Sequence, residues 1–263
     1  GVIYESRPNV TIDVAALCLR SGNAVVLRGG SDAEFTNLIL VSLIHQAIEE
    51  NDLPTDLVQL LPIDRVFVKE LLLADKYVDI IIPRGSQELI NFVREHSKVP
   101  TIETGAGVCH TYVDRSADPD MAIRVCLDAK TQYVAVCNAT ETILVHRDIA
   151  DTLLPDLASA LSGAGVELFG DETARALTGC RPAENWHTEY LDYKVSLRVV
   201  GGLEEAVDHI NRYGSGHTDA ILTEDREAAG RFMSQVDSGN VFWNCSTRFS
   251  DGFRYGFGAE VGV

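Results

Sequence analysis

The sequence has no long apolar run, and its first residues carry no targeting signal. No stretch approaches the roughly 20 consecutive apolar residues that span a bilayer. Residues 1–5 match neither a signal peptide nor a transit peptide. These absences predict a cytoplasmic protein, or one inside an organelle such as the mitochondrion, with no membrane as its partner.

Positive charge is scarce. The chain has 22 lysines and arginines against 39 aspartates and glutamates, a formal net charge of −17. Such a protein repels the phosphates of nucleic acids and the headgroups of anionic lipids. The charge therefore excludes both as expected partners. If a small-molecule substrate is an anion, individual arginines, lysines or backbone N–H groups must attract it.

Paired cysteines and metal-ligand spacings are also absent. The six cysteines form no C-x-x-C pair and are too sparse for a disulfide framework, which predicts thiols in a reducing compartment. Histidines and cysteines do not fall at zinc-ligand spacings, so no metal site is expected. The cysteines are Cys18, Cys109, Cys126, Cys137, Cys180 and Cys245.

What the sequence does contain is a regular alternation of short β-branched runs and amphipathic stretches, which is typical of an α/β protein with a parallel sheet. Residues 24–27 predict a strand, 28–30 a glycine turn, and Ser31 with Glu34 a capping box that opens a helix to about Glu50. Two further strand-turn-helix units follow. Their predicted strands are 57–61 and 78–82, and their predicted helices are 65–74 and 87–96.

A glycine-rich stretch at 104–107 predicts a boundary between two domains, 1–104 and 105–263. The second domain again alternates strands and helices. Its predicted strands are 110–113, 141–146, 166–169, 193–200, 220–223 and 241–244, and its predicted helices are 119–129, 152–161, 203–212 and 226–236. Because the chain opens in a strand and stops without a terminal helix or polar tail, we expect a piece of a longer protein.

The glycine turns suit a dinucleotide, because glycine lets the backbone approach a phosphate and the next helix offers unpaired N–H groups. The signal is weak. Residues 28–31 are not G-x-G-x-x-G, and Gly105 with Gly107 lacks the third glycine. Each glycine could equally be an ordinary turn residue.

Cys137 is the best candidate nucleophile, because it lies in a loop of small residues after a helix that is predicted to end near Lys130. A neighbouring ammonium or a cluster of backbone N–H groups would lower the pKa of such a thiol. A buried structural thiol is the alternative for any single cysteine. Cys245, near Arg248, is the one rival.

Two hydrolase arrangements compete with this interpretation. A cysteine protease would need a histidine base, and His110, His146 and His217 are available at spacings that exclude nothing. A serine hydrolase is disfavoured, because Ser215 lacks the G-x-S-x-G elbow. The repeated glycine turns favour a cofactor domain, which a protease does not need.

Five segments together resemble the gamma-glutamyl phosphate reductases, a branch of the aldehyde dehydrogenase superfamily. They occur in the family's order and extend over nearly the whole chain. They are YESRPN at 4–9, SGNAVVLRGG at 21–30, AVCNATET at 135–142, YGSGHTD at 213–219 and STRFSDG at 246–252.

The resemblance implies an aldehyde dehydrogenase-like fold, with a Rossmann-like cofactor domain, an α/β catalytic domain and an active site in the cleft between them. Cys137 would attack the acyl phosphate of L-glutamyl 5-phosphate and form a thioester, which NADPH reduces to L-glutamate 5-semialdehyde in proline biosynthesis. The backbone N–H of Cys137 and the side chain of Asn9 would stabilise the oxyanion. Glu103 stands where aldehyde-oxidising relatives place a base for thioester hydrolysis; here it is a site-wall carboxylate or merely shapes its loop.

The same resemblance implies the binding residues. Arg28, Gly29 and Ser31 would hold the adenosine ribose, with a cation and a hydroxyl that favour the 2′-phosphate of NADPH. Gly85 and Ser86 would face the pyrophosphate. Glu189 would accept the hydroxyls of the nicotinamide ribose. The expected substrate-binding residues are Lys130, His217 and Arg248, with Arg248 the preferred anion binder and His217 equally suited to satisfying a loop carbonyl.

Members of this family are longer at both ends. The first part of the cofactor domain and a C-terminal closing segment used in oligomerisation would be missing here. The full-length protein would be a homo-oligomer, either a standalone reductase or the reductase part of a bifunctional pyrroline-5-carboxylate synthase. Two other functions stay open: a catalytically silent nucleotide-binding or assembly fragment, and an aldehyde-oxidising dehydrogenase in which Glu103 activates water.

Overall fold

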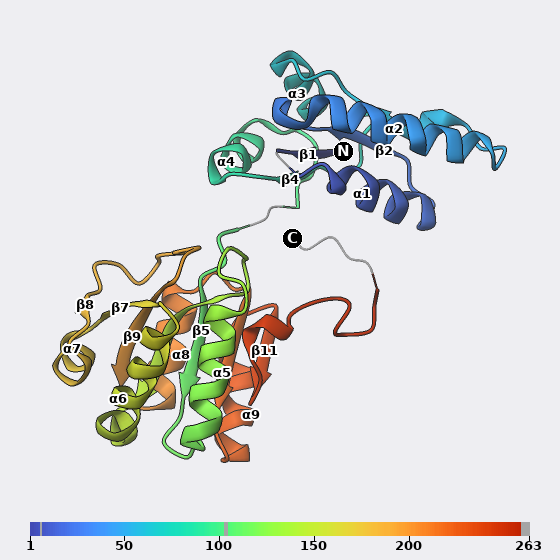
Figure 1. Cartoon of the computed structure of the whole chain (residues 1–263). Coiled ribbons are helices and arrows are strands. Elements are labelled where there is room, and N and C mark those ends of the chain that lie inside the picture. Colours follow the sequence, from blue (N-terminus) through green and yellow to red (C-terminus); the bar gives the residue numbers. More distant parts are fainter. Residues whose placement is uncertain (6, 103–104, 259–263) are drawn as a thin grey trace. The chain divides into compact units, whose positions relative to one another are not determined.

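The computed structural model describes residues 1–5, 7–102 and 105–258, which form two compact units (Figure 1). The first unit is Gly1–Gly105 with the short stretch that starts at Gly256, and the second is Ala106–Tyr255. Within the described residues, no helix is long and apolar enough to cross a membrane.

The first unit is built on a parallel sheet of four strands in the order β3-β2-β1-β4. Successive residues of β1 point to opposite faces, so Val2 and Tyr4 join one core while Ile3 joins the other. The strands are β1 (Val2–Tyr4), β2 (Val25–Arg28), β3 (Val58–Leu60) and β4 (Ile82–Arg84).

Helices cover both faces of this sheet. Side chains of α1 (Asn9–Arg20) and α2 (Glu34–Glu49) pack in the first core, and those of α3 (Arg65–Leu72) and α4 (Gln87–His96) pack in the second. The predicted strand-turn-helix order is thus confirmed, and α1, which contains Cys18, is a helix for which no bounds were predicted. Two 3₁₀ turns, η1 (Ser31–Ala33) and η2 (Thr55–Leu57), precede α2 and β3.

Two local predictions in this unit are wrong. The capping box does not form, because Ser31 lies in the 3₁₀ turn ahead of α2, and Ala33, which has no capping oxygen, occupies the N-cap. The strand predicted at 78–82 is instead β4, shifted toward the C-terminus to include Pro83 and Arg84. Proline lacks an N–H but is tolerated there, because β4 ends the four-stranded order.

The second unit contains a parallel sheet of seven strands in the order β11-β10-β5-β6-β9-β7-β8. Its middle strands are almost fully buried, as is typical of a parallel sheet covered on both faces. The strands are β5 (Cys109–Val113), β6 (Thr140–His146), β7 (Glu167–Gly170), β8 (Arg181–Pro182), β9 (Lys194–Val200), β10 (Thr218–Leu222) and β11 (Asn240–Trp243).

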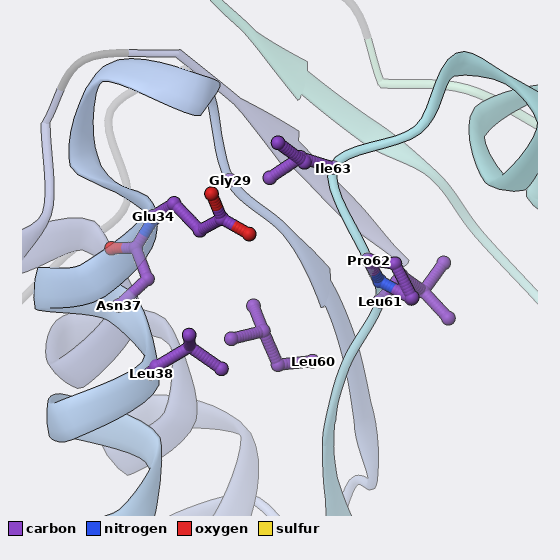
Figure 2. A pocket seen from close by; sticks show the side chains of 8 residues that line it. All are labelled: Gly29, Glu34, Asn37, Leu38, Leu60, Leu61, Pro62 and Ile63. Atoms are coloured by element: carbon purple, nitrogen blue, oxygen red, sulfur yellow. The ribbon is translucent and has the colours of Figure 1, made fainter.

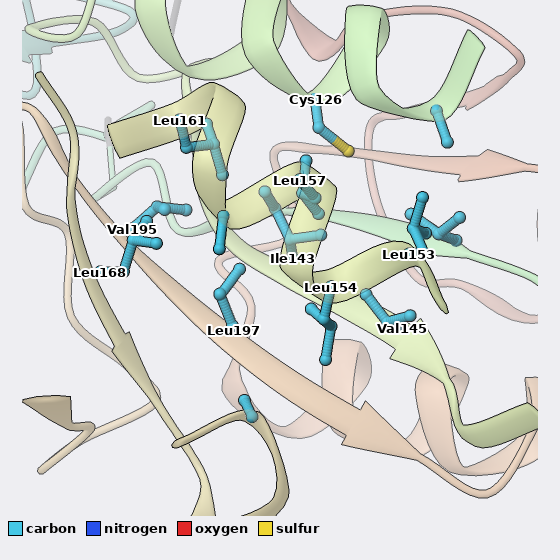
Figure 3. Packing of buried hydrophobic residues seen from close by; sticks show 14 of the residues in the cluster. Cys126, Ile143, Val145, Leu153, Leu154, Leu157, Leu161, Leu168, Val195 and Leu197 are labelled. Carbon is cyan, nitrogen blue, oxygen red and sulfur yellow. The ribbon is translucent and has the colours of Figure 1, made fainter. Parts of the chain in front are cut away.

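Two helical layers cover this sheet. On one face α5 (Pro119–Thr131), α6 (Arg147–Gly163) and α7 (Glu172–Thr178) pack on β6 and β9, and Figure 3 shows Leu154 and Leu157 of α6 against Ile143 and Leu197 of those strands. On the other face lie α8 (Leu203–Tyr213) and α9 (Arg226–Gln235). A 3₁₀ turn, η3 (Thr247–Phe249), follows β11. The predicted α/β fold with parallel sheets is confirmed.

Candidate active site

Four segments meet at one edge of the second sheet, where its strands begin. Residues 106–108, 132–139, 187–193 and 214–217 precede β5, β6, β9 and β10, which are neighbours in the order β10-β5-β6-β9. Because the strands are parallel, the segments before them gather at the same edge, which we call the amino edge. It carries three of the predicted site residues: Cys137, Glu189 and His217.

Hydrogen bonds connect these segments. The backbone N–H of Gly107 donates to Glu189 Oε1 at 2.7 Å, and the N–H of Val108 donates to Ser215 Oγ at 3.0 Å. The buried thiol of Cys109 donates to the carbonyl oxygen of Cys137 at 3.1 Å. The amino edge is therefore one connected structure, held mainly by contacts that the sequence reading missed.

Cys137 lies in a turn between α5 and β6 and has an exposed side chain. The turn is closed by the N–H of Ala139, which donates to the carbonyl of Val136 at 3.1 Å. Its backbone packs tightly on Gly107, since a Cβ atom at 107 would lie only 1.9 Å from the Cys137 carbonyl oxygen. The predicted nucleophile is thus accessible while the backbone behind it is held closely.

Arg248 lies in η3 and interacts electrostatically with Cys137. Burial lowers the pKa of the Arg248 guanidinium, and the negative charge of the Cys137 thiolate opposes that shift. Asn138 Nδ2 donates to the carbonyl of Ser250 at 2.8 Å, which ties the cysteine turn to the segment that carries Arg248. Arg248 Nε and Asn138 Oδ1 are buried without a hydrogen-bond partner among the described residues. Unpaired buried polar atoms beside a thiol suit a site that binds a polar ligand.

His217 precedes β10, and its Nδ1 lies 2.8 Å from Thr218 Oγ1. Burial lowers the pKa of His217, with the charges of Asp219 and Glu189 opposing the shift. The imidazole is therefore neutral at pH 7 and can offer a hydrogen bond but not a positive charge. Glu189 has already used one carboxylate oxygen on Gly107, so a ribose would have to share that carboxylate with the backbone.

The expectation that Lys130 binds the substrate needs correction. Its side chain is fully buried, and its Nζ lies 2.7 Å from Oε2 of Glu141, which is equally buried. Burial lowers the pKa of Lys130, and Glu141 opposes the shift. A lysine held in this way cannot reach a ligand. The signal that the sequence offered was Glu141, a carboxylate that comes shortly before the apolar run Ile143 to Val145 in one strand and that needs a partner when buried.

In the first unit, a cavity of about 210 Å³ lies at the ends of β2 and β3 (Figure 2). In Figure 2, the carboxylate of Glu34 points toward the space bordered by Leu60 and Ile63. The predicted Gly29 lines this cavity, whereas Arg28 donates a hydrogen bond to the carbonyl of Ile63. The lining residues are Gly29, Glu34, Asn37, Leu38, Leu60, Leu61, Pro62 and Ile63.

The predicted pyrophosphate position is occupied by a carboxylate of the protein itself. Glu5 accepts hydrogen bonds from the backbone N–H of Ser86 at 2.8 Å and from its hydroxyl at 3.2 Å, at the start of α4. A Cβ atom at Gly85 would lie 2.5 Å from Glu5 Oε2. The N-terminus of α4 thus attracts an anion, as helix dipoles do, and a cofactor phosphate would have to displace Glu5.

The remaining predicted residues are placed as follows. Ser31 is exposed in η1, and Asn9 is the first residue of α1. Glu103 lies outside the described residues. Each unit is described by itself, so the predicted cooperation of Asn9 with Cys137 stays a prediction. In the described ranges, no group of three histidine, cysteine or acidic side chains could hold a metal ion.

Comparison with known proteins places these features in context. Residues 8–175 match the model of the aldehyde dehydrogenase family. The gamma-glutamyl phosphate reductase of Acetivibrio thermocellus is 56% identical over the whole chain, which covers 61% of that relative. The resemblance predicted from the motifs is confirmed, and the chain spans about three fifths of the length of the curated relatives it matches.

Solved structures agree. The crystal structure of the gamma-glutamyl phosphate reductase of Thermotoga maritima matches the whole chain with a TM-score of 0.97 at 45% identity, and the match covers 64% of that chain. A glyceraldehyde-3-phosphate dehydrogenase of Methanocaldococcus jannaschii, solved with NADP, matches 95% of this chain and 65% of its own, with a TM-score of 0.71 at 18% identity. That second likeness is one of fold alone.

Proposed function

The chain belongs to the aldehyde dehydrogenase family, and on that premise we propose that it carries the reductase chemistry of a gamma-glutamyl phosphate reductase. The reaction is the reduction of L-glutamyl 5-phosphate to L-glutamate 5-semialdehyde and phosphate, a step of proline biosynthesis in the cytoplasm. The observation that carries the proposal is the exposed Cys137, which lies in electrostatic contact with Arg248.

Cys137 supplies the nucleophile in this proposal. Its thiolate attacks the acyl carbon, and the carbon–oxygen bond to phosphate breaks to leave a thioester and free phosphate. The Arg248 guanidinium binds the anionic phosphate, which an acidic protein must attract locally. The backbone N–H of Cys137 and the side chain of Asn9, in the role predicted for it, stabilise the oxyanion. His217 donates a hydrogen bond to the substrate. Once the acyl carbon is reduced, the bond to Cys137 breaks and the aldehyde leaves.

A nicotinamide cofactor, NADPH in this proposal, supplies the hydride when bound. The cavity beside Gly29 and the anion-attracting start of α4 fit such a group, and the fold neighbour from Methanocaldococcus was solved with NADP. Arg28 and Ser31 would face the 2′-phosphate, whereas the carboxylate of Glu34 opposes it. Glu189 accepts one hydrogen bond from the N–H of Gly107, and its carboxylate would use its remaining acceptor positions to hold the nicotinamide ribose.

The test is NADP reduction by glutamate semialdehyde, with and without phosphate, in the protein encoded by the complete gene. We expect turnover that requires phosphate and disappears in Cys137→Ala. The same assay of the chain itself shows whether this part suffices. Turnover without phosphate that is lost in Glu103→Gln would replace the proposal with an aldehyde-oxidising dehydrogenase. No turnover in any protein would leave a binding or assembly role.

A further inference from the structure

A buried ion pair lies behind the amino edge. Lys130 near the end of α5 and Glu141 near the start of β6 are 2.7 Å apart, and neither side chain is exposed. Such a pair loses much of its attraction to the cost of leaving water, so apolar side chains of the same size would stabilise the fold at least as well. A role beyond stability must therefore be sought in what the pair touches.

The pair holds a strained turn. Glu141 Oε1, the oxygen that does not face Lys130, accepts a hydrogen bond from the backbone N–H of Leu191 at 3.3 Å. Leu191 has a φ of 50°, a left-handed conformation that a leucine adopts only when its surroundings impose it. The ring of Tyr190 also lies 6.0 Å from Lys130 Nζ. The ion pair thus fixes the backbone at 190–191.

From this turn, contacts lead to the reactive thiol. Glu189, two residues before Leu191, accepts the N–H of Gly107, and Gly107 packs directly on the carbonyl of Cys137. A second route passes through one residue only. The thiol of Cys109 donates to the same carbonyl, and Cys109 interacts electrostatically with both Lys130 and Glu141. Both routes end on the backbone of Cys137, not on its side chain.

We propose that the Lys130–Glu141 pair is a positioning device for the thiol of Cys137: it fixes the 189–191 turn, and through Glu189 and Gly107 it sets the backbone from which the thiol faces Arg248. The inference rests on the proposed role of Cys137 as nucleophile. Lys130 and Glu141 touch no substrate in this arrangement. Burial raises the pKa of Glu141 to about 7, and the adjacent ammonium of Lys130 opposes that shift.

The decisive variant is Lys130→Met with Glu141→Leu, which removes both charges together and keeps the side-chain volume. Replacing a buried pair in this way commonly preserves folding. Glu141→Gln is the conservative partner, because its amide oxygen can still accept from Leu191. The matched control is Arg231→Met with Glu204→Leu, which removes an ion pair of the same unit in which both side chains are exposed.

The readout is the alkylation of Cys137 by iodoacetamide as a function of pH, followed by peptide mass spectrometry. We expect the paired variant to melt like the wild type but to alkylate about tenfold more slowly at pH 7, since a one-unit rise in thiol pKa removes that share of thiolate. Glu141→Gln should recover most of the rate, and the control should not change it. A folded paired variant whose alkylation rate and pH midpoint stay within twofold of wild type overturns the proposal.

A double-mutant cycle with Glu189→Ala tests the route. If the pair acts through Glu189, adding Glu189→Ala to the paired variant slows alkylation no further, whereas independent effects would multiply and contradict the route. In the turnover assay, kcat should fall by roughly 10- to 100-fold, the order that a misplaced reacting group costs, with KM almost unchanged. Alkylation needs no turnover, so it judges this inference even if the proposed reaction fails.

Discussion

Position 107 requires glycine because of a neighbouring segment, and not because of its own backbone angles. A Cβ atom there would lie 1.9 Å from the carbonyl oxygen of Cys137, a distance that no rotation of a side chain relieves. The contact is backbone against backbone, so one segment must move. A glycine in a glycine-rich stretch looks like a turn residue in the sequence, and only the packing shows which glycine is indispensable.

We therefore predict that Gly107→Ala displaces the Cys137 turn and lowers kcat by about 100-fold, as expected for a reacting group that moves by an ångström. The matched control is Gly105→Ala, because nothing lies within 4 Å of a Cβ atom at that position. Steady-state kinetics of both variants, with circular dichroism to verify folding, provide the measurement. Equal rates in the two variants would contradict the prediction.

A second single residue, Glu34, is expected to affect the preference between NADPH and NADH. Its carboxylate faces the cavity at the ends of β2 and β3, where it would repel the 2′-phosphate of the proposed cofactor (Figure 2). We predict that Glu34→Gln raises kcat/KM for NADPH relative to NADH by roughly fivefold, the equivalent of about 1 kcal/mol between two charges in water. Glu49→Gln, on the same helix but outside the cavity lining, should leave the ratio unchanged. A ratio that moves toward NADH would show that Glu34 does not face the phosphate.

At the scale of elements, α8 buries a histidine against β5. The ring of His209 lies 5.2 Å from that of His110, and its Nδ1 lies 2.7 Å from a guanidinium nitrogen of Arg198. Burial, together with the charges of His110 and Arg198, lowers the pKa of His209 from 6.5 to about 3. The folded protein therefore holds this histidine neutral under conditions in which the unfolded chain protonates it.

The sign of the pH effect follows. Above pH 6.5, His209 is neutral in both states and does not change the free energy of unfolding with pH. As the pH falls from 6.5 toward 3, the unfolded chain binds a proton at His209 that the folded protein does not bind. We predict that the free energy of unfolding falls by up to about 1.4 kcal/mol per pH unit in this window, and that His209→Gln flattens the slope. Urea unfolding at pH 4.5, 5.5 and 7.5 measures it. If the free energy of unfolding depends on pH equally in His209→Gln and in the wild type, groups other than His209 cause the effect.

The elements also show what a sequence can and cannot reveal. Most strands and helices of the second unit were predicted within a few residues, because alternating apolar patterns reflect burial directly, as in β9 and α8. The short helix α7 and the two-residue strand β8 were not predicted. No bounds were predicted for the helix α1, although Cys18 was placed in a helical pattern. The start of α2 was misread, because Ser31 is a residue type that often caps helices but does not occupy the N-cap position here. Local chemistry of this kind depends on where the backbone turns.

The site was predictable only in part, for a similar reason. Cys137, Glu189 and His217 reach one edge because parallel strands begin there, which the strand order explains and the sequence does not state. The interpretation of Lys130 failed because its partner, Glu141, was counted as an ordinary strand residue. Cys109 and Gly107 carry no motif, and their contacts with Cys137 exist only in the folded chain.

At the scale of the whole molecule, the two units have separate cores. The second unit buries both faces of its sheet with its own helices, so it has what a domain needs to fold alone. We predict that residues 106–255, expressed separately, unfold in one cooperative transition and retain the pH profile of Cys137 alkylation. Thermal melting and peptide mapping of that fragment provide the check. A fragment without a cooperative transition would show that the units stabilise each other.

The order of strands in the second sheet also bears on how the protein is made. β5 comes first in the unit, yet one of its two partners is β10, with Asp219 paired to His110. A chain leaving the ribosome exposes one edge of β5 until more than a hundred further residues have been synthesised, and contacts so distant in sequence form slowly. During translation this unit is therefore an open sheet with an unpaired central strand, the state in which chaperone binding or aggregation would compete with folding.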